Sequence, residues 1–185
     1  MDLRRTSAAL LAAAGVITGA LLTTAAPAQA YGTLDVRNAR VDTGNCARLS
    51  GTLTVTPATY GCYLYDSVDD TYFVKDAGGE AAKIELRNGG TLVSKVEFHP
   101  YDRNLWIYDT SNDGDTVYVR LYSTKRAQWS PVYYAKGTDA AIDYHRVTPE
   151  DEPWLARIAE DEDILVEVYD NSDATGRITG VWARA

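Results

Sequence analysis

KIELRNGGTLVSKV, residues 83–96, is the stretch that decides the fold. Apolar and polar residues alternate on both sides of Asn88-Gly89-Gly90, which is the pattern of two strands that each bury one face. Glycine supplies the positive φ that a tight hairpin turn demands. The stretch therefore predicts an antiparallel hairpin. A second hairpin is predicted from residues 105–108 and 116–122, which residues 109–115 connect.

Similar segments recur along the rest of the chain. They are short, rich in Val, Ile, Thr and Tyr, and bounded by clusters of Gly, Asn, Asp and Ser, which is typical of strands joined by turns. The pattern predicts strands at residues 33–37, 52–56, 62–65, 71–74, 82–87, 91–98, 105–108, 116–122, 142–146, 164–169 and 178–183.

One segment has helical spacing instead. Trp154, Leu155 and Ile158 fall on one face, and acidic residues precede them where the positive end of a helix dipole would lie. Pro153 must lie in the first turn, because proline lacks the N–H that a helix interior uses. We expect one short helix near residues 151–160 in a mostly β fold, an antiparallel β-sandwich.

Residues 1–30 have the layout of a cleavable secretory signal peptide. Arg4 and Arg5 precede an apolar run at residues 8–22, and Ala28-Gln29-Ala30 supplies small residues for cleavage. The run is shorter than the roughly 20 residues that span a bilayer. We expect a secreted, extracellular protein without a membrane anchor after cleavage, whose single β-rich domain is residues 31–185.

Cys46 and Cys62 are the two cysteines of the chain. An even pair in an oxidising compartment usually forms a disulfide, and the spacing is not the C-x-x-C of a redox pair. We expect a bridge that closes the loop 47–61 and adds roughly 3 kcal/mol of stability.

The chain is acidic. Residues 1–30 carry two basic and one acidic side chain, so residues 31–185 have a formal net charge of −9 against −8 for the whole chain. This surface repels nucleic acid and anionic membranes, because affinity for phosphate backbones depends on Lys and Arg. A basic partner fits better, and the plainer interpretation is that the charge keeps the protein soluble.

Three triplets form a weak, irregular repeat: Tyr65-Asp66-Ser67, Tyr108-Asp109-Thr110 and Tyr169-Asp170-Asn171. Each ends a predicted strand and opens a polar loop. The plain interpretation is that Asp and Asn side chains bond their own backbone to start turns. The alternative is that the three loops gather at one end of the fold and form a binding rim.

The loop 109–115 resembles the first half of a calcium loop. Its oxygen-bearing side chains at alternate positions are Asp109, Ser111, Asp113 and Asp115. The twelfth position is Arg120, where an EF-hand needs a bidentate Glu, and no flanking helices are predicted. The loop is a weak calcium candidate, and a hairpin turn explains the same residues.

Catalysis finds little support in the sequence. The two histidines, His99 and His145, lie in or beside predicted strands, and no nucleophile motif accompanies them. Zinc needs three or four ligands, which two histidines and a disulfide-bonded cysteine pair do not provide. Paired carboxylates for glycoside hydrolysis are too numerous to be informative. We expect a protein that is not an enzyme and uses no cofactor.

Aromatic residues give a better clue, since the chain has 13 Tyr and four Trp. Both residue types place a large apolar body and a polar tip at contact surfaces, although tyrosine also favours strands. The binding candidates are Trp106, Trp129, Tyr133 and Tyr134. Pro131 lies between Trp129 and Tyr133, and because proline cannot sit in a central strand, this segment is predicted to be an edge strand or an exposed loop.

These features together resemble a known family. A small exported β-domain with one cysteine pair, an Ala-rich signal and Tyr-Asp loops such as residues 105–114 is similar to the adaptor subunit of the umbrella toxin particles of Streptomyces. The resemblance covers residues 31–185 in size and character and contains no diagnostic motif. It implies a non-catalytic role joining a toxin-bearing stalk protein to lectin subunits in an antibacterial particle, and it transfers no site residue.

Three functions follow as hypotheses. The first is a secreted, non-enzymatic adaptor that binds secreted protein partners in an extracellular assembly, for which a free N-terminal strand within residues 31–43 could pair with a partner's sheet edge. The alternatives are a carbohydrate-binding module that uses exposed Trp and Tyr, and a secreted protease inhibitor that uses a rigid loop near the disulfide.

Overall fold

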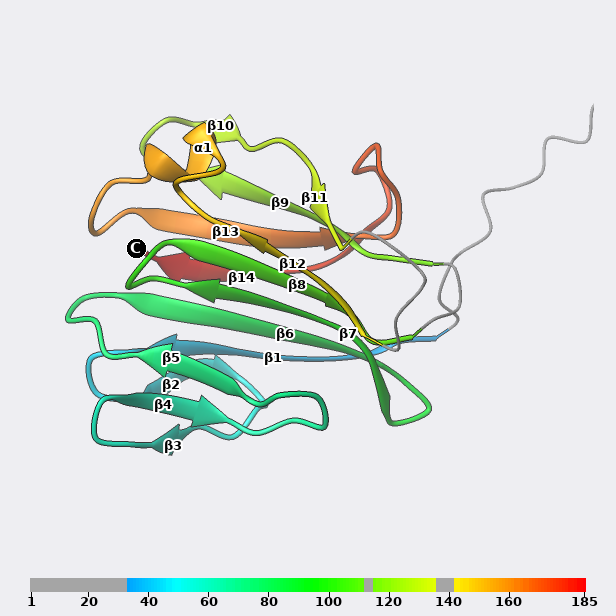
Figure 1. Cartoon of the computed structure of the whole chain (residues 1–185), viewed down its shortest axis with the longest axis horizontal. Helices are drawn as coiled ribbons and strands as arrows, with labels where there is room; N and C mark the ends of the chain where they lie inside the picture. The colour runs from blue at the N-terminus through cyan, green and yellow to red at the C-terminus, as the bar shows by residue number, and fades with distance from the viewer. Residues whose placement is uncertain (1–32, 112–114, 136–141) are drawn as a thin grey trace, which may run out of the picture.

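The computed structural model describes residues 33–111, 115–135 and 142–185, so the predicted signal peptide lies outside the described residues. The described strands and helix follow in this order (Figure 1): β1 (Asp35–Asp42), β2 (Ala47–Gly51), β3 (Thr56–Pro57), β4 (Gly61–Leu64), β5 (Thr71–Val74), β6 (Glu80–Asn88), β7 (Thr91–His99), β8 (Asn104–Asp109), β9 (Tyr118–Ser123), β10 (Gln128–Trp129), β11 (Tyr133–Tyr134), β12 (Asp143–Val147), α1 (Pro153–Ala156), β13 (Asp163–Tyr169) and β14 (Arg177–Arg184).

The predicted hairpin at residues 83–96 is confirmed as β6 and β7. Asn88 pairs with Thr91 across a two-residue turn, in which Gly89 and Gly90 have φ of 56° and 88°. Both angles lie in the left-handed region that glycine adopts without steric cost. The turn residues therefore fix the register of the pair around which the rest of the sheet is built.

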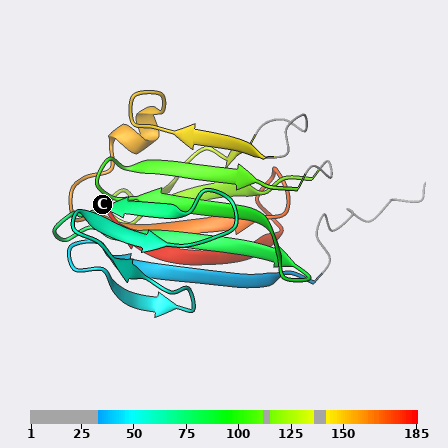
Figure 2. The same ribbon diagram turned by 60° about the horizontal axis from the view of Figure 1, so that its bottom comes forward.

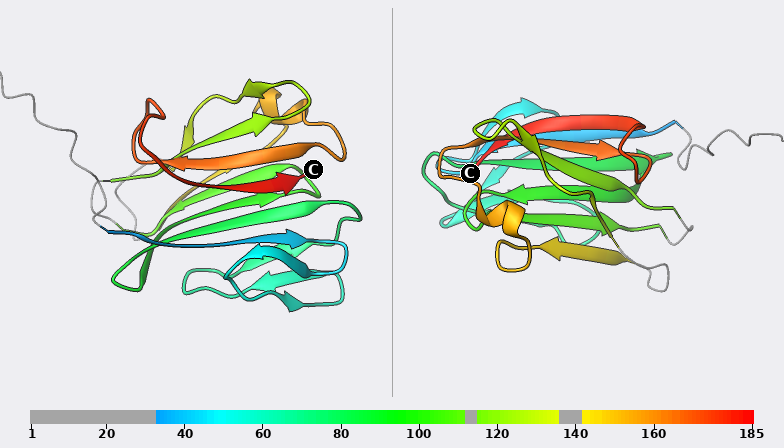
Figure 3. Two further views of the ribbon diagram at one scale, coloured as in Figure 1. Left: turned by 180° about the vertical axis from the view of Figure 1, so that it is seen from behind. Right: turned by 90° about the horizontal axis from the view of Figure 1, so that it is seen from above.

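The larger sheet has eleven strands within the described residues. Its path is β10-β9-β13-β14-β6-β7-β8-β12, with β1 paired to β6 and β2, and β11 paired to β9. β14 joins β6 through one residue pair, Arg184 and Glu80, whereas β6 pairs with β1 over residues 80–87 and with β7 over residues 82–88. The mostly β, antiparallel fold is confirmed, and the larger sheet curls into a half-barrel (Figure 3) where a β-sandwich was expected.

The inside of the curl holds the main core. Alternate side chains of β6 point inward, and the facing strands and α1 supply the rest. The two ends of the sheet also approach each other, since Nδ1 of His145 in β12 lies 2.9 Å from the carbonyl oxygen of Tyr134 in β11. The core includes Ile84, Leu86, Val96, Phe98, Leu105, Ile107, Val119, Leu121, Leu155, Ile164, Val166 and Val181.

A second, smaller core lies on the other side of β1 and β6. There the three-stranded sheet β3-β4-β5 packs against the larger sheet (Figure 2). The predicted disulfide between Cys46 and Cys62 is present and is buried in this core with Leu64 and Phe73. The bridge thus ties the turn after β1 to the middle strand of the small sheet.

Two strand predictions at the N-terminal end were wrong in detail. Residues 52–56 were predicted as one strand, but the chain bends there between β2 and β3, because the N–H groups of Thr52 and Leu53 both donate to the carbonyl of Asn38. β1 is longer than predicted and pairs on both edges, with β2 and β6. The described part of the N-terminal segment is therefore not a free strand.

The predicted helix exists but is a single turn. Pro153 occupies its first turn as expected, and Trp154, Leu155 and Ile158 are buried in the main core. The helix ends early because the Glu162 carboxylate accepts the N–H of Ala159 at 2.8 Å, which redirects the chain toward β13. Within residues 33–111, 115–135 and 142–185, no helix has the length and hydropathy of a membrane span.

The Trp129-to-Tyr134 segment forms an interrupted edge strand. β10 and β11 both pair with β9, and Pro131 lies in the break between them. Proline has no N–H to donate to a ladder, so it is tolerated at a sheet edge.

The double variant Cys46→Ala/Cys62→Ala is expected to lose about 3 kcal/mol of unfolding free energy, because the unfolded chain regains the freedom that the closed loop removes. Guanidinium titration at equilibrium measures this loss. The wild-type chain treated with a reductant is the matched control and should lose a similar amount. A loss below about 1 kcal/mol would contradict the stabilising role given to the bridge.

Candidate functional site

The outward face of β6 and β7 carries charged side chains that are fully buried. Lys83 and Lys95 have 0% exposed area, and Glu85 and Glu97 are also buried. In the strand register Lys83 lies opposite Glu97, and Glu85 lies opposite Lys95. Opposite charges therefore face each other across the two strands, an arrangement that stabilises a sheet.

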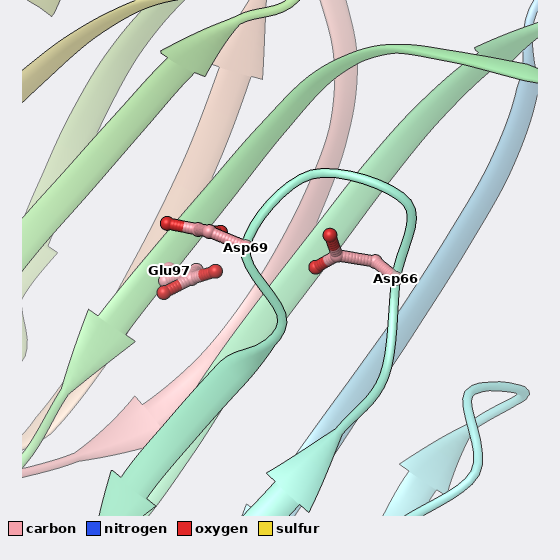
Figure 4. A group of neighbouring side chains, drawn as sticks. All are labelled: Asp66, Asp69 and Glu97. Atoms are coloured by element: carbon pink, nitrogen blue, oxygen red, sulfur yellow. The ribbon is translucent and has the colours of Figure 1, made fainter.

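Lys95 lies at the centre of this charged layer (Figure 4 shows the acidic residues around it). Its Nζ is 2.9 Å from Oδ2 of Asp66 and 3.0 Å from Oε1 of Glu97, and it also donates to Oδ1 of Asp69. Asp66 and Asp69 come from the loop between β4 and β5, which lies over β7. One ammonium group thus holds the small sheet's loop to the larger sheet.

Lys83 makes the neighbouring set of contacts. Its Nζ lies 2.7 Å from the same Asp66 oxygen, 3.0 Å from the carbonyl oxygen of Leu64 and 3.0 Å from Oε1 of Glu85. Arg87 completes the layer with an ion pair of 2.8 Å to Glu85. Buried lysines are tolerated when they are paired and hydrogen-bonded in this way.

Glu97 is held on its other side by two side chains. The hydroxyl of Thr71 donates to Oε1 at 2.5 Å, and Nε2 of His99 lies 2.9 Å from Oε2. We name this set the charged layer: Asp66, Asp69, Thr71, Lys83, Glu85, Arg87, Lys95, Glu97 and His99.

These contacts shift the acid–base properties of the layer. Burial alone would raise the pKa of Asp66, but hydrogen bonds from Lys83 and Lys95 outweigh it, and the pKa lies well below the usual 3.8. Burial opposes ionisation of Glu97 too, and the contacts with His99 and Lys95 bring its pKa below the usual 4.5. For Lys95 the carboxylates outweigh burial and raise the pKa. Asp66, Glu97 and Lys95 are therefore ionised at neutral pH.

Three of these acids could hold a metal ion by their spacing alone. One oxygen each of Asp66, Asp69 and Glu97 lies within 4.8 Å of the others. The Lys95 ammonium contacts all three carboxylates, so it already supplies the positive charge that a cation would bring. The geometry assigns the cluster to stability rather than to metal binding.

Aromatic side chains continue the same face beyond the charged layer. Trp106 and Tyr108 are alternate residues of β8, which lies beside β7, and Tyr144 of β12 lies opposite Tyr108. Their ring centroids are 6.1, 5.9 and 6.0 Å apart, and the ring planes differ by 11° to 30°. We call Trp106, Tyr108 and Tyr144 the aromatic platform.

The charged layer fixes one side of the platform. The hydroxyl of Tyr108 donates to Oδ2 of Asp69 at 2.9 Å, and Lys95 Nζ lies 4.4 Å from the centre of the Tyr108 ring. Burial, together with the nearby carboxylates of Glu97 and Asp69, raises the pKa of Tyr108, which keeps its hydroxyl a donor. Tyr108 is 6% exposed and forms the floor, whereas Tyr144 is 62% exposed.

A cavity of about 270 Å³ opens at the platform, lined by Asp69, Trp106, Tyr108 and Tyr144. The Arg146 guanidinium lies 5.1 Å from the Trp106 ring centre and 3.6 Å from the Asp102 carboxylate. Rings at the centre with polar groups at the rim are the composition of a ligand-binding site.

The four predicted binding residues do not form one site. Trp106 belongs to the platform, whereas Trp129 packs on Tyr122 and Tyr134 on Tyr118, around the sheet edge at β9. Tyr133 is buried in the main core, and burial raises the pKa of its hydroxyl. The structure thus places Trp106 apart from the other three.

The calcium candidate is described only in part, because Asp113 lies outside the described residues. Asp109 is buried at the end of β8, and its Oδ1 accepts the N–H of Ser111 at 3.1 Å. This contact is the side-chain-to-backbone bond of a turn, which the plain interpretation of the Tyr-Asp triplets expects. Asp115, the last of the four candidate ligands, is described and precedes β9.

The triplets also bear on the rim hypothesis. The strands before them, β4, β8 and β13, point to the same end of the molecule (Figure 1). The loop after the first triplet contacts the second through Asp69 and Tyr108. The third loop closes on itself, with the N–H of Asp170 bonded to the carbonyl of Gly176. The loop after the first triplet therefore meets the tyrosine of the second triplet at the platform.

Sequence reasoning missed most of this site. Asp69, Lys95 and Tyr144 were not selected, although Lys-x-Glu alternation in both strands of the predicted hairpin was a visible signal. On its own, that alternation indicates a solvent-exposed face. Nothing in the local pattern shows that the loop between β4 and β5 covers this face.

Lys95→Met is expected to lower the unfolding free energy by about 3 to 5 kcal/mol at pH 7, because the buried carboxylates of Asp66 and Glu97 and the half-exposed carboxylate of Asp69 lose their shared partner. Chemical denaturation measures the loss. Lys75→Met, which changes an exposed lysine, is the matched control and should stay within about 0.5 kcal/mol of the wild type.

The pH dependence of stability should also change. Asp66 and Glu97 have lowered pKa values in the folded state, so they stabilise it above their unfolded pKa values and lose that contribution as the pH falls below about 4.5. In Lys95→Met this acid-induced loss should shrink, because protonation then relieves unpaired charge. Identical pH profiles of the two proteins would contradict the assigned role of Lys95.

Comparison with known proteins gave no match among protein-family models, curated proteins or solved structures.

Proposed function

We propose that the protein is an exported, non-enzymatic binding module that attaches to a partner in an extracellular assembly through the aromatic platform. The observation that supports this proposal most is the platform itself, three aromatic rings held together on one sheet face beside a cavity. Trp and Tyr are the residues that most often dominate binding energy at interfaces.

The platform has the rigidity that such a site needs. Its rings stand on paired strands, and Tyr108 is fixed by its bond to Asp69 and by Lys95. A site that is already ordered before binding loses little conformational entropy when its partner arrives. The charged layer therefore supports binding as well as stability.

The described histidines support a non-catalytic role. His99 is bonded to Glu97 beneath the small sheet, and His145 is bonded to the Tyr134 carbonyl at the sheet seam. Each has a structural partner, and neither belongs to a nucleophile–base–orienter arrangement.

An adaptor needs a second contact surface. The aromatic pairs around β9, with Arg120 over the Trp129 ring at 5.1 Å, lie on different strands from the platform and offer one. The resemblance to umbrella toxin adaptors supports the finer proposal that the assembly is an antibacterial particle. The protease-inhibitor alternative stays a prediction.

Affinity capture from culture medium with the tagged, secreted chain tests this proposal. We expect stoichiometric partners whose recovery falls about 10-fold or more for Trp106→Ala and Tyr144→Ala, the size of a typical interface hot spot. Tyr60→Ala is the matched control, because Tyr60 is 77% exposed in the turn between β3 and β4. Partners retained at full yield by both platform variants would argue against the proposed surface.

A further inference from the structure

We propose that the ligand seated on the aromatic platform is a neutral carbohydrate, with a pyranose ring stacked on Trp106 and Tyr144 and its hydroxyl groups bonded to Asp69 and Arg146. This inference rests on the proposed function, because it names what the same surface contacts.

The arrangement of the rings is the first support. The three distances between ring centroids are nearly equal. In a linear stack of three rings, the two outer centroids would be about twice as far apart as neighbouring ones, so the rings do not form such a stack. Their planes lie within 30° of one another, so they are also not the walls of a box around a cation. The near-parallel rings of Trp106 and Tyr144, with Tyr108 as the floor, suit a ligand with a broad, flat face.

Sugar rings have such a face. The axial C–H groups of a pyranose carry slight positive charge, and the faces of aromatic rings are negative, so the two surfaces attract while apolar area is buried. Tyr144 and the partly exposed Trp106 can offer this contact. Tyr108 acts from below, since its ring already faces Lys95.

The rim supplies both kinds of hydrogen-bonding group. Asp69 is 47% exposed at its side chain, and its carboxylate has lone pairs beyond those that bind Lys95 and Tyr108. Arg146 is 46% exposed and has five N–H donors, of which the contact with Asp102 uses a part. Sugar hydroxyls donate and accept, so one sugar ring can bond both groups.

Charge balance favours a neutral ligand. Asp69 is already paired with Lys95, and Arg146 with Asp102, so neither group needs a counterion. A cationic ligand would compete with Lys95 for Asp69, and an anionic one would compete with Asp102 for Arg146. The cavity of about 270 Å³ lies at the small end of ligand sites, which fits one or two sugar rings.

Isothermal titration of the secreted chain with four probes tests the inference: cellohexaose, chitohexaose, mannohexaose and dextran. We expect at least one to bind at micromolar to millimolar concentration and to change tryptophan fluorescence. Tyr144→Ala and Trp106→Leu should weaken binding at least 10-fold, Trp106→Tyr should retain it within a few-fold, and Tyr60→Ala should not change it. Asp69→Asn and Arg146→Gln should each weaken it several-fold. Thermal unfolding confirms that each variant is folded.

The outcomes separate this inference from the proposed function. If no probe binds at millimolar concentration but captured partners still depend on Trp106 and Tyr144, the carbohydrate inference is wrong and the binding module stands. Partner binding that disappears after enzymatic deglycosylation of the partner supports the inference. A trimethyl-lysine peptide that binds in place of the sugars, with the same sensitivity to Tyr144→Ala, overturns it in favour of a cation site.

Discussion

The docking of the small sheet's loop on the larger sheet and the position of the Tyr108 ring both depend on the buried ammonium group of Lys95. It neutralises carboxylates from β7 and from the loop between β4 and β5, so it joins the small sheet's loop to the large sheet. It also lies against the Tyr108 ring, which forms the floor of the aromatic platform. Removing charges from water is costly, and the cost is met only when every partner is in place. Stability and the shape of the binding face are therefore two results of one set of contacts.

Local chemistry was enough to predict much of the fold. The turn at Gly89 and Gly90 determined the central hairpin, 71–74 was predicted with the observed bounds, and the cysteine pair is bonded. The failures came where long-range contacts decide the structure. The bend after β2 depends on the carbonyl of Asn38, and the early end of α1 depends on the Glu162 side chain. Neither contact can be inferred from hydrophobic periodicity.

The candidate site was less predictable for the same reason. Trp106 was selected from composition, but its neighbour Tyr144 is brought to it by the pairing of β8 with β12, which the sequence does not specify. Alternating Lys and Glu residues indicate an exposed strand face unless something covers it. Here the cover comes from residues that precede the hairpin by many positions, and its identity appears only in three dimensions.

The charged outward face of β6 and β7 has a consequence for the protein while it folds. If the larger sheet forms before the small sheet docks, that face presents alternating ammonium and carboxylate groups to water, whereas an apolar face at the same place would favour association with other chains. A half-assembled molecule thus stays hydrated on its uncovered side. The same residues that are costly to bury at the end of folding protect the chain from aggregation at the beginning.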